Sequence, residues 1–166
     1  MSDWQALDRE LRAWREAGRQ DTFWWRDDER PTAALHRLLT LARATGVPVA
    51  LAVIPAGAGA ELATALRERN DVAVLCHGLG HLNHAPAEAR QAEFGPHRPV
   101  FEMLGEVATG WQRLKLLFPE QALAVFVPPW NRIDPELVTR LPLAGLAGLS
   151  ALGRRDAVQP APNLVQ

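Results

Sequence analysis

Short apolar runs alternate along this chain with segments whose apolar residues recur at helical spacing, and this alternation constrains the fold more than any other feature. The apolar runs predict strands at 22–28, 47–54, 72–76, 122–127 and 146–149. Apolar residues three or four positions apart predict helices at 31–46, 61–69, 100–118 and 134–140. Strands that alternate with helices are typical of a parallel sheet, so we expect an α/β fold.

The first 18 residues precede this alternating region and predict a separate amphipathic helix. Its apolar residues Trp4, Leu7, Leu11 and Trp14 follow helical spacing, and Gly18 ends it. The chain has 166 residues, 48% of them hydrophobic, which predicts one domain over 1–166. A complete (β/α) barrel typically has ~250 residues, so this chain is short for one.

The composition excludes several classes of function. Eighteen Lys and Arg residues balance nineteen Asp and Glu residues without a basic face, so we expect no nucleic-acid partner. The longest apolar stretch, 47–60, is shorter than the ~20 residues of a spanning helix, and no signal peptide is visible. We therefore expect no membrane partner and a cytoplasmic location. The lone Cys76 excludes an internal disulfide and a cysteine zinc finger.

Three polar clusters lie at the carboxyl ends of three predicted strands. They are the pair Asp27-Asp28, the pair His77 and His81, and the segment 128–132, Pro-Pro-Trp-Asn-Arg. The carboxyl ends of parallel strands share one edge of the sheet, where α/β proteins bind their ligands. The sequence therefore predicts one site built from all three clusters.

The histidine pair is the candidate metal site. Three residues separate His77 from His81, a spacing that lets two imidazoles reach one metal ion. Two histidines and one aspartate commonly hold a catalytic metal and leave a position for water. The alternative is a pair of surface histidines held by hydrogen bonds, and the carboxylates on a neighbouring strand favour the metal.

The two adjacent carboxylates can take different roles. Side chains alternate along a strand, so Asp27 and Asp28 face different sides and one can bind metal while the other acts as a base. The alternative is an acidic surface turn over 27–30 with its own ion pair. Cys76, next to His77, should point away from it and pack as an inert thiol.

The segment 78–99 is too long for an ordinary connection between a strand and a helix, which favours a functional loop. Within it, His84 and His97 are loop residues that become ligands only if the loop folds inward. His36, on a predicted helix, is a surface or packing residue. Trp130 is the candidate for stacking on a sugar because it lies in the third cluster.

The three clusters, in this order, resemble the motifs of the polysaccharide deacetylases, the NodB-homology group that forms carbohydrate esterase family 4. The family's aspartate pair corresponds to F-W-W-R-D-D at 23–28, its His-x-x-x-His to H-G-L-G-H at 77–81, and its Arg-x-Pro-aromatic segment to V-P-P-W at 127–130. The resemblance covers about 22–131, and the wording A-E-F-G and V-P-P-W-N-R is similar to a bacterial deacetylase-like subgroup.

The resemblance implies a distorted (β/α)7 barrel that holds a divalent metal, zinc first and cobalt, nickel or manganese as alternatives. Asp28, His77 and His81 would be the ligands and Asp27 the general base. The backbone N–H of Trp130 would stabilise the oxyanion. The substrate-binding candidates are Trp130, Asn131, His84 and Arg98.

The chain also departs from the family. Val127 stands where the family has an arginine that orients the base, and Arg132 or Arg98 could replace it. The late motifs, including the histidine that supplies the general acid, have no match, so either His84 or His97 serves as the acid or there is none. We expect a barrel incomplete at its C-terminus, with the last βα units missing and residues 164–166 entering a further strand.

The leading hypothesis is a metal-dependent hydrolase that removes an acetyl group from an N-acetylated sugar or polysaccharide, its small-molecule partner. The alternative is a catalytically silent deacetylase-like domain that binds metal or carbohydrate. A third class, the non-haem iron oxygenases, also uses two histidines and a carboxylate. Strand–helix alternation does not suit the all-β scaffold of those enzymes.

Overall fold

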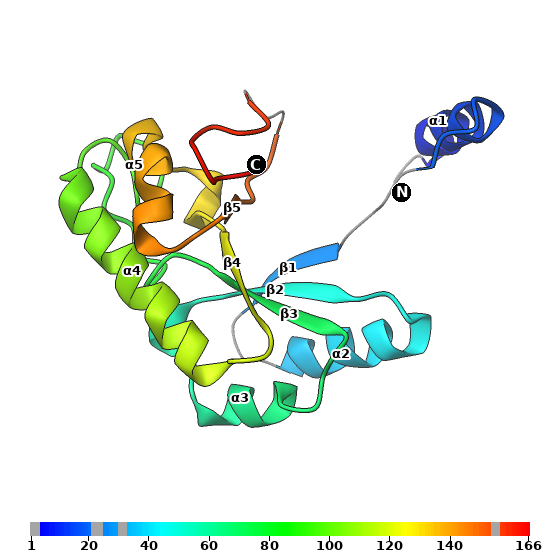
Figure 1. Cartoon of the computed structure of the whole chain (residues 1–166), viewed down its shortest axis with the longest axis horizontal. Helices are drawn as coiled ribbons and strands as arrows, with labels where there is room; N and C mark the ends of the chain where they lie inside the picture. Colours follow the sequence, from blue (N-terminus) through cyan, green and yellow to red (C-terminus); the bar gives the residue numbers. More distant parts are fainter. Residues whose placement is uncertain (1–3, 21–24, 30–32, 154–156) are drawn as a thin grey trace.

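The fold is a five-stranded parallel sheet that curls into half of a barrel (Figure 1). The structure is a computed structural model, and it describes residues 4–20, 25–29, 33–153 and 157–166. The strands are β1 (Trp25–Glu29), β2 (Val49–Val53), β3 (Val72–Cys76), β4 (Ala122–Phe126) and β5 (Gly148–Leu149). They lie in the order in which they occur in the chain, and each pairs in parallel with the next. This order is that of a (β/α) barrel, and the predicted α/β class is confirmed, whereas a closed barrel of seven repeats is not shown.

Three helices cover the convex side of the sheet. They are α2 (Ala33–Thr45), α3 (Ala60–Leu66) and α4 (Val100–Leu117), which lie on one side of the strands in Figure 1. A fourth helix, α5 (Pro135–Arg140), follows β4 and packs on α4. Its predicted start is confirmed, because the Asp134 side chain accepts the backbone N–H of Glu136 at 2.7 Å.

The two faces of the sheet bury different amounts of apolar surface. In β2, Val49, Leu51 and Val53 face the helices and belong to the main hydrophobic core. The alternate residues Ala50 and Ala52 face the concave side, in a small separate cluster with Leu75 and Val127. The centre of the concave side is therefore lined by the alanines of β2 together with Leu75 and Val127.

The long connection after β3 and the tail after β5 form little regular secondary structure. Residues 78–99 form no strand or helix and make one isolated bridge, Phe94 with Ile133. The tail makes no helix in its described part, and Val165 forms an isolated parallel bridge with Gly148 of β5, while a further strand at 164–166 stays a prediction. Residues 22–24 of the first predicted strand and Pro31 lie outside the described residues.

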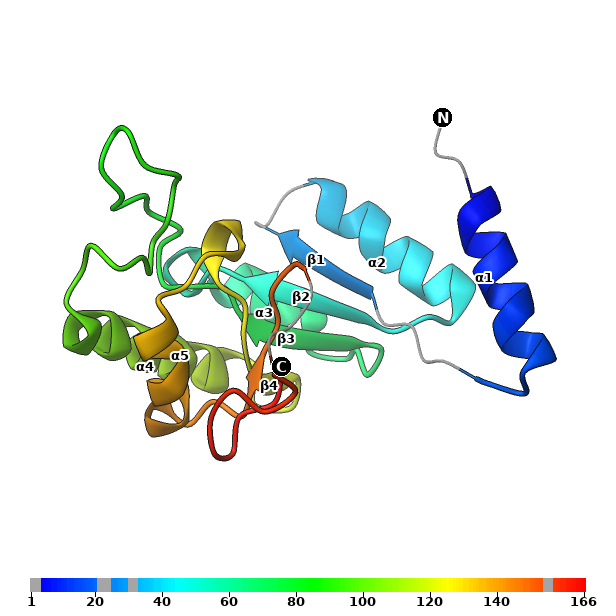
Figure 2. The same cartoon turned by 90° about the horizontal axis from the view of Figure 1, so that it is seen from above.

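The N-terminal helix α1 (Gln5–Glu16) is present as predicted, and it lies apart from the sheet in both views (Figures 1 and 2). It buries none of its residues. Across the described residues, none of the helices has the length and apolar character needed to cross a membrane.

Candidate active site

The carboxyl ends of β1 and β3 bring Asp28 and His77 to the same edge of the sheet. Asp28 is in register with Ala52 of β2, and Ala52 with Leu75 of β3, so all three lie on the concave face. His77 follows two residues after Leu75, and its backbone N–H donates to the carbonyl of Val53 at 3.0 Å. The sheet register therefore directs Asp28 and His77 to the same side.

Asp27 faces the other side of the sheet. Its register partner is Leu51, which belongs to the main core beneath the helices. The predicted divergence of the two carboxylates is therefore present, and both lie within β1 rather than in a surface turn. The strand directs Asp27 away from the histidines, and its role as the base stays a prediction.

His77 is buried and has a defined tautomer. Its Nδ1 lies 3.0 Å from the carbonyl oxygen of Val127, which can only accept, so Nδ1 carries the hydrogen and Nε2 keeps its lone pair. Burial lowers the pKa of His77, although the Val127 carbonyl and the charge of Asp28 act in the opposite direction. A neutral imidazole oriented by a backbone carbonyl is the form that binds a metal through Nε2.

His81 packs between His77 and Trp130. Its ring centroid lies 5.0 Å from that of His77 and 4.2 Å from that of Trp130. Two imidazoles on one tetrahedral zinc, with Zn–N of ~2.0–2.1 Å, have centroids about 5 Å apart, so the pair fits a common ion. His81, Trp130 and Asn131 all have positive φ, of 55°, 53° and 57°. Non-glycine residues in this region are strained and gather at functional sites.

The buried carboxylate of Glu93, to which the sequence analysis gave no role beyond the A-E-F-G wording, supports the histidine turn. Glu93 is 1% exposed, and its Oε1 accepts the backbone N–H of Gly80 at 2.8 Å while its Oε2 accepts that of Leu79 at 3.4 Å. Its neighbours Ala92 and Phe94 are also buried. The sequence could have indicated that Glu93 is buried, because it lies between two apolar residues in a long loop.

Arg26 is the second residue that the sequence analysis missed. Its Nε lies 3.1 Å from Oδ1 of Asp28, and its Nη1 donates to the carbonyl oxygen and the Oγ of Ser150 at 3.0 and 2.9 Å. The sequence could have indicated this contact, because residues two positions apart face the same side of a strand and Arg26 lies two positions before Asp28.

The arginines expected near the carboxylates have other partners. Arg132 donates to the carbonyl of Gln91 at 2.8 Å. Arg98 forms a two-point ion pair with Glu106, which raises the pKa of Arg98, and it also donates to the carbonyl of Glu93. The expectation that either replaces the family's arginine is therefore not met in this structure, where Arg26 contacts a carboxylate instead.

The other candidate residues differ in burial and in their contacts. Asn131 lies beside Trp130 and accepts the backbone N–H of Leu152 at 2.9 Å. His84 and His97 are exposed on the loop. Cys76 is buried in the main core, as predicted, and desolvation together with Glu93 raises the pKa of its thiol to about 12.

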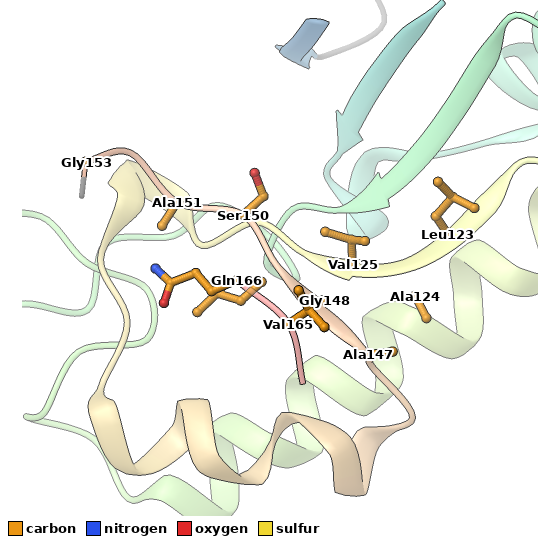
Figure 3. Close-up of a pocket in the computed structure, with 11 residues that line it drawn as sticks. Leu123, Ala124, Val125, Ala147, Gly148, Ser150, Ala151, Gly153, Val165 and Gln166 are labelled. Carbon is orange, nitrogen blue, oxygen red and sulfur yellow. The ribbon is translucent and has the colours of Figure 1, made fainter. Parts of the chain in front are cut away.

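A cavity of about 790 Å³ lies along β4 and β5 next to the C-terminal tail (Figure 3). Its lining is mostly apolar and includes Leu123, Val125 and Val165. Ser150, which also lines it, is the residue that Arg26 contacts. The cavity therefore reaches the residue to which Arg26 donates, while Arg26 and Asp28 themselves are not among its lining residues.

The described residues include no group of three or more His, Cys, Asp or Glu side chains placed to hold a metal ion. The histidine pair fits a metal in its spacing and in the tautomer of His77. Asp28 is close enough to raise the pKa of His77, but its carboxylate is paired with Arg26. The two histidines are therefore in contact with each other, whereas Asp28 lies on the same face of the sheet and is paired with Arg26.

The comparisons with known proteins agree with the fold. No family model and no curated protein matches the chain. A solved structure of a de-N-acetylase from Aggregatibacter actinomycetemcomitans is similar, with a TM-score of 0.67 and 10% sequence identity. The match covers 99% of this chain and 75% of that one. At this identity the similarity shows that the two chains share a fold.

Proposed function

We propose that this protein is an amide hydrolase of the polysaccharide-deacetylase type, acting on an N-acetylated sugar. The observation that carries the proposal is the His77–His81 pair, with its ring spacing of 5.0 Å and a His77 tautomer set by Val127, at the ligand-binding edge of the half-barrel. The fold shared with a de-N-acetylase supports this reaction class.

His77, His81 and Asp28 would hold a divalent metal, for which zinc suits the imidazole and carboxylate donors. Such an ion would polarise the acetamide carbonyl and lower the pKa of its water. His77 presents Nε2 because Nδ1 donates to Val127, and His81 is held by Trp130. These two contacts orient the imidazoles before a metal arrives, which reduces the cost of binding one.

The turn after β4 would supply the oxyanion donor. The N–H groups of Asn131 and Arg132 donate to the carbonyls of Pro128 and Pro129 at 2.9 and 3.2 Å. The N–H of Trp130, next to His81, would then be the donor of the turn that meets a developing negative charge. Asn131, His84 and Arg98 would contact the sugar around it.

A silent domain that binds metal or carbohydrate is the second candidate. It is favoured by the direction of Asp27, which the strand turns toward the main core, and by the partners of Arg98 and Arg132. The two candidates differ in whether Asp27 reaches the site to act as the base.

Metal content and turnover separate the candidates. We expect the purified chain to bind about one zinc per molecule, and His81→Ala and Asp28→Ala to weaken zinc binding while the exposed His36→Ala does not. Acetate released from an N-acetylglucosamine oligomer, and lost in Asp27→Asn, supports the hydrolase. Zinc binding without release of acetate supports the silent domain. A wild-type chain that binds no zinc would overturn the hydrolase, and one that also fails to bind the N-acetylglucosamine oligomer would overturn the silent domain.

A further inference from the structure

The N-terminal helix α1 presents a stripe of apolar side chains, none of which is buried. The stripe consists of Trp4, which directly precedes the helix, and Leu7, Leu11 and Trp14, with Trp4 67% and Leu7 39% exposed. The helix has 12 residues, and isolated helices of this length are only marginally stable in water. Such a helix gains its stability by packing its apolar side on another surface, so α1 requires a partner.

The half-barrel has an apolar surface of its own along β4 and β5. The cavity of about 790 Å³ there is lined by Leu123, Val125 and Val165 among others, and Leu123 is 49% and Val165 55% exposed (Figure 3). Val125 also packs against the small cluster on the concave side of the sheet. The interior of a closed (β/α) barrel is filled by packed side chains. In the half-barrel this part of the interior is open, so apolar side chains from another segment can enter it.

The two apolar surfaces do not meet within one copy of the chain. Helix α1 lies apart from the sheet in both views, on the side away from β4 and β5 (Figures 1 and 2). A helix that lies apart from its own domain, while a matching surface of that domain is open, is the arrangement expected for domain exchange between two copies. A second copy is the occupant that satisfies both surfaces, because a twofold dimer pairs each helix with the cavity of the other copy.

We propose that two copies of this chain form a symmetric dimer by exchanging α1, so that each helix packs its apolar stripe into the cavity along β4 and β5 of the other copy. The area is sufficient for a dimer. The four tryptophans of two exchanged stripes would cover about 600–1,000 Å², and the cavity walls that face them lose a similar area. Stable interfaces bury about 1,200–2,000 Å² in total. The dimer does not depend on the proposed function, because no residue of the histidine site takes part in it.

Analytical ultracentrifugation of the purified chain in the micromolar range tests for the dimer and measures its Kd. The double substitution Leu7→Gln and Leu11→Gln should raise this Kd at least about 100-fold, because burial of one leucine contributes about 10–100-fold. Arg9→Gln places the same residue on the opposite side of α1 and should leave the Kd unchanged. In the cavity, Leu123→Gln should raise the Kd about 10–100-fold, whereas Leu116→Gln, at an exposed leucine of α4, should not.

A crosslinking experiment separates exchange between copies from docking within one copy. The native Cys76 is buried, so cysteines introduced as Arg15→Cys on α1 and Ala151→Cys in the cavity lining are the thiols that a bismaleimide reaches. The two variants are prepared separately, mixed and left to exchange chains. We expect a covalent dimer that contains one chain of each variant. If a chain that carries both substitutions crosslinks only within itself, α1 occupies its own cavity and the exchange is wrong.

Two further results would overturn the dimer. One is a chain that is monomeric throughout the micromolar range, and the other is a dimer whose Kd does not respond to the substitutions on α1 or to those in the cavity. Circular dichroism melts identify any variant that is unfolded. If Leu123→Gln does not fold, Val165→Gln, at a cavity residue that is 55% exposed, takes its place. None of these results bears on zinc binding or acetate release, which test the proposed function separately.

Discussion

Glu93 accepts the backbone N–H of Gly80 at 2.8 Å, so a buried carboxylate supports the turn that carries both histidines. The same carboxylate lies against Gly78 and is 1% exposed. Glu93 lies fourteen positions after Leu79, and its Oε2 accepts the N–H of Leu79. The long loop thus folds back on its own beginning and fixes the path of the chain between His77 and His81.

Removing this acceptor should destabilise the fold. Glu93→Ala leaves the N–H of Gly80, and the weaker donor at Leu79, without a partner, and an unsatisfied buried donor costs about 1–3 kcal/mol. Glu93→Gln keeps one acceptor oxygen and should cost less. Urea denaturation measures both changes, with the exposed Glu120→Ala as the control. A Glu93→Ala chain as stable as Glu120→Ala would contradict this account of the turn.

Gly78 should not tolerate a side chain. Its φ is +66°, and an added Cβ would collide with Oε2 of Glu93 and lie 2.7 Å from Cγ of Pro129. Gly46 has nearly the same φ, +65°, with nothing within 4 Å of an added Cβ. Both alanine variants carry the backbone strain of about 1–3 kcal/mol, and Gly78→Ala carries the collision as well. We expect a clearly larger loss of unfolding free energy for Gly78→Ala, and equal losses would show that the carboxylate moves aside freely.

Helix α4 packs closely on the same turn at Gly110. An added Cβ there would lie 3.0 Å from the carbonyl oxygen of Gly78 and 3.0 Å from Cγ of Pro55, whereas one at Gly105 would meet nothing within 4 Å. Alanine in place of a helix glycine gains about 0.5–1 kcal/mol where space allows. We expect Gly105→Ala to raise the melting temperature and Gly110→Ala to lower it. If both variants gain stability, the helix is not in tight contact with the turn.

The metal-free protein should lose stability as the pH falls below 6.5. Burial lowers the pKa of His77 from its ordinary value of 6.5, so the unfolded chain takes up a proton at a pH where the folded chain does not. The unfolded state then binds more protons, and the free energy of unfolding decreases as the pH falls through 6.5 toward the lowered pKa. Each unit of difference between the two pKa values is worth about 1.4 kcal/mol.

Urea denaturation between pH 7.5 and 5.5, with a chelator present, measures this dependence. We expect His77→Gln to flatten it and the exposed His36→Gln to leave it unchanged. An unchanged slope in His77→Gln would assign the dependence to another group. If His77→Gln does not fold, the imidazole resonances of the wild-type protein, followed by NMR over the same range, give the same answer.

Much of the architecture could be predicted because it is encoded locally. The strand over Val72–Cys76 follows directly from its apolar run, and the opposite directions of Asp27 and Asp28 follow from the two-residue period of a strand. The contacts of Arg98 and Arg132 could not be predicted in this way. They depend on where Glu106 and Gln91 come to lie once the loop has packed.

The sequence by itself determined a parallel α/β fold and the edge of the sheet at which polar residues gather, because periodicity acts between residues a few positions apart. Only the tertiary structure decided which groups meet at that edge. Arg26 and Ser150 are 124 residues apart, and they touch because the helices on one face and the small side chains on the other let the sheet curl. That curl results from the packing of the whole chain, so no local pattern contains this contact.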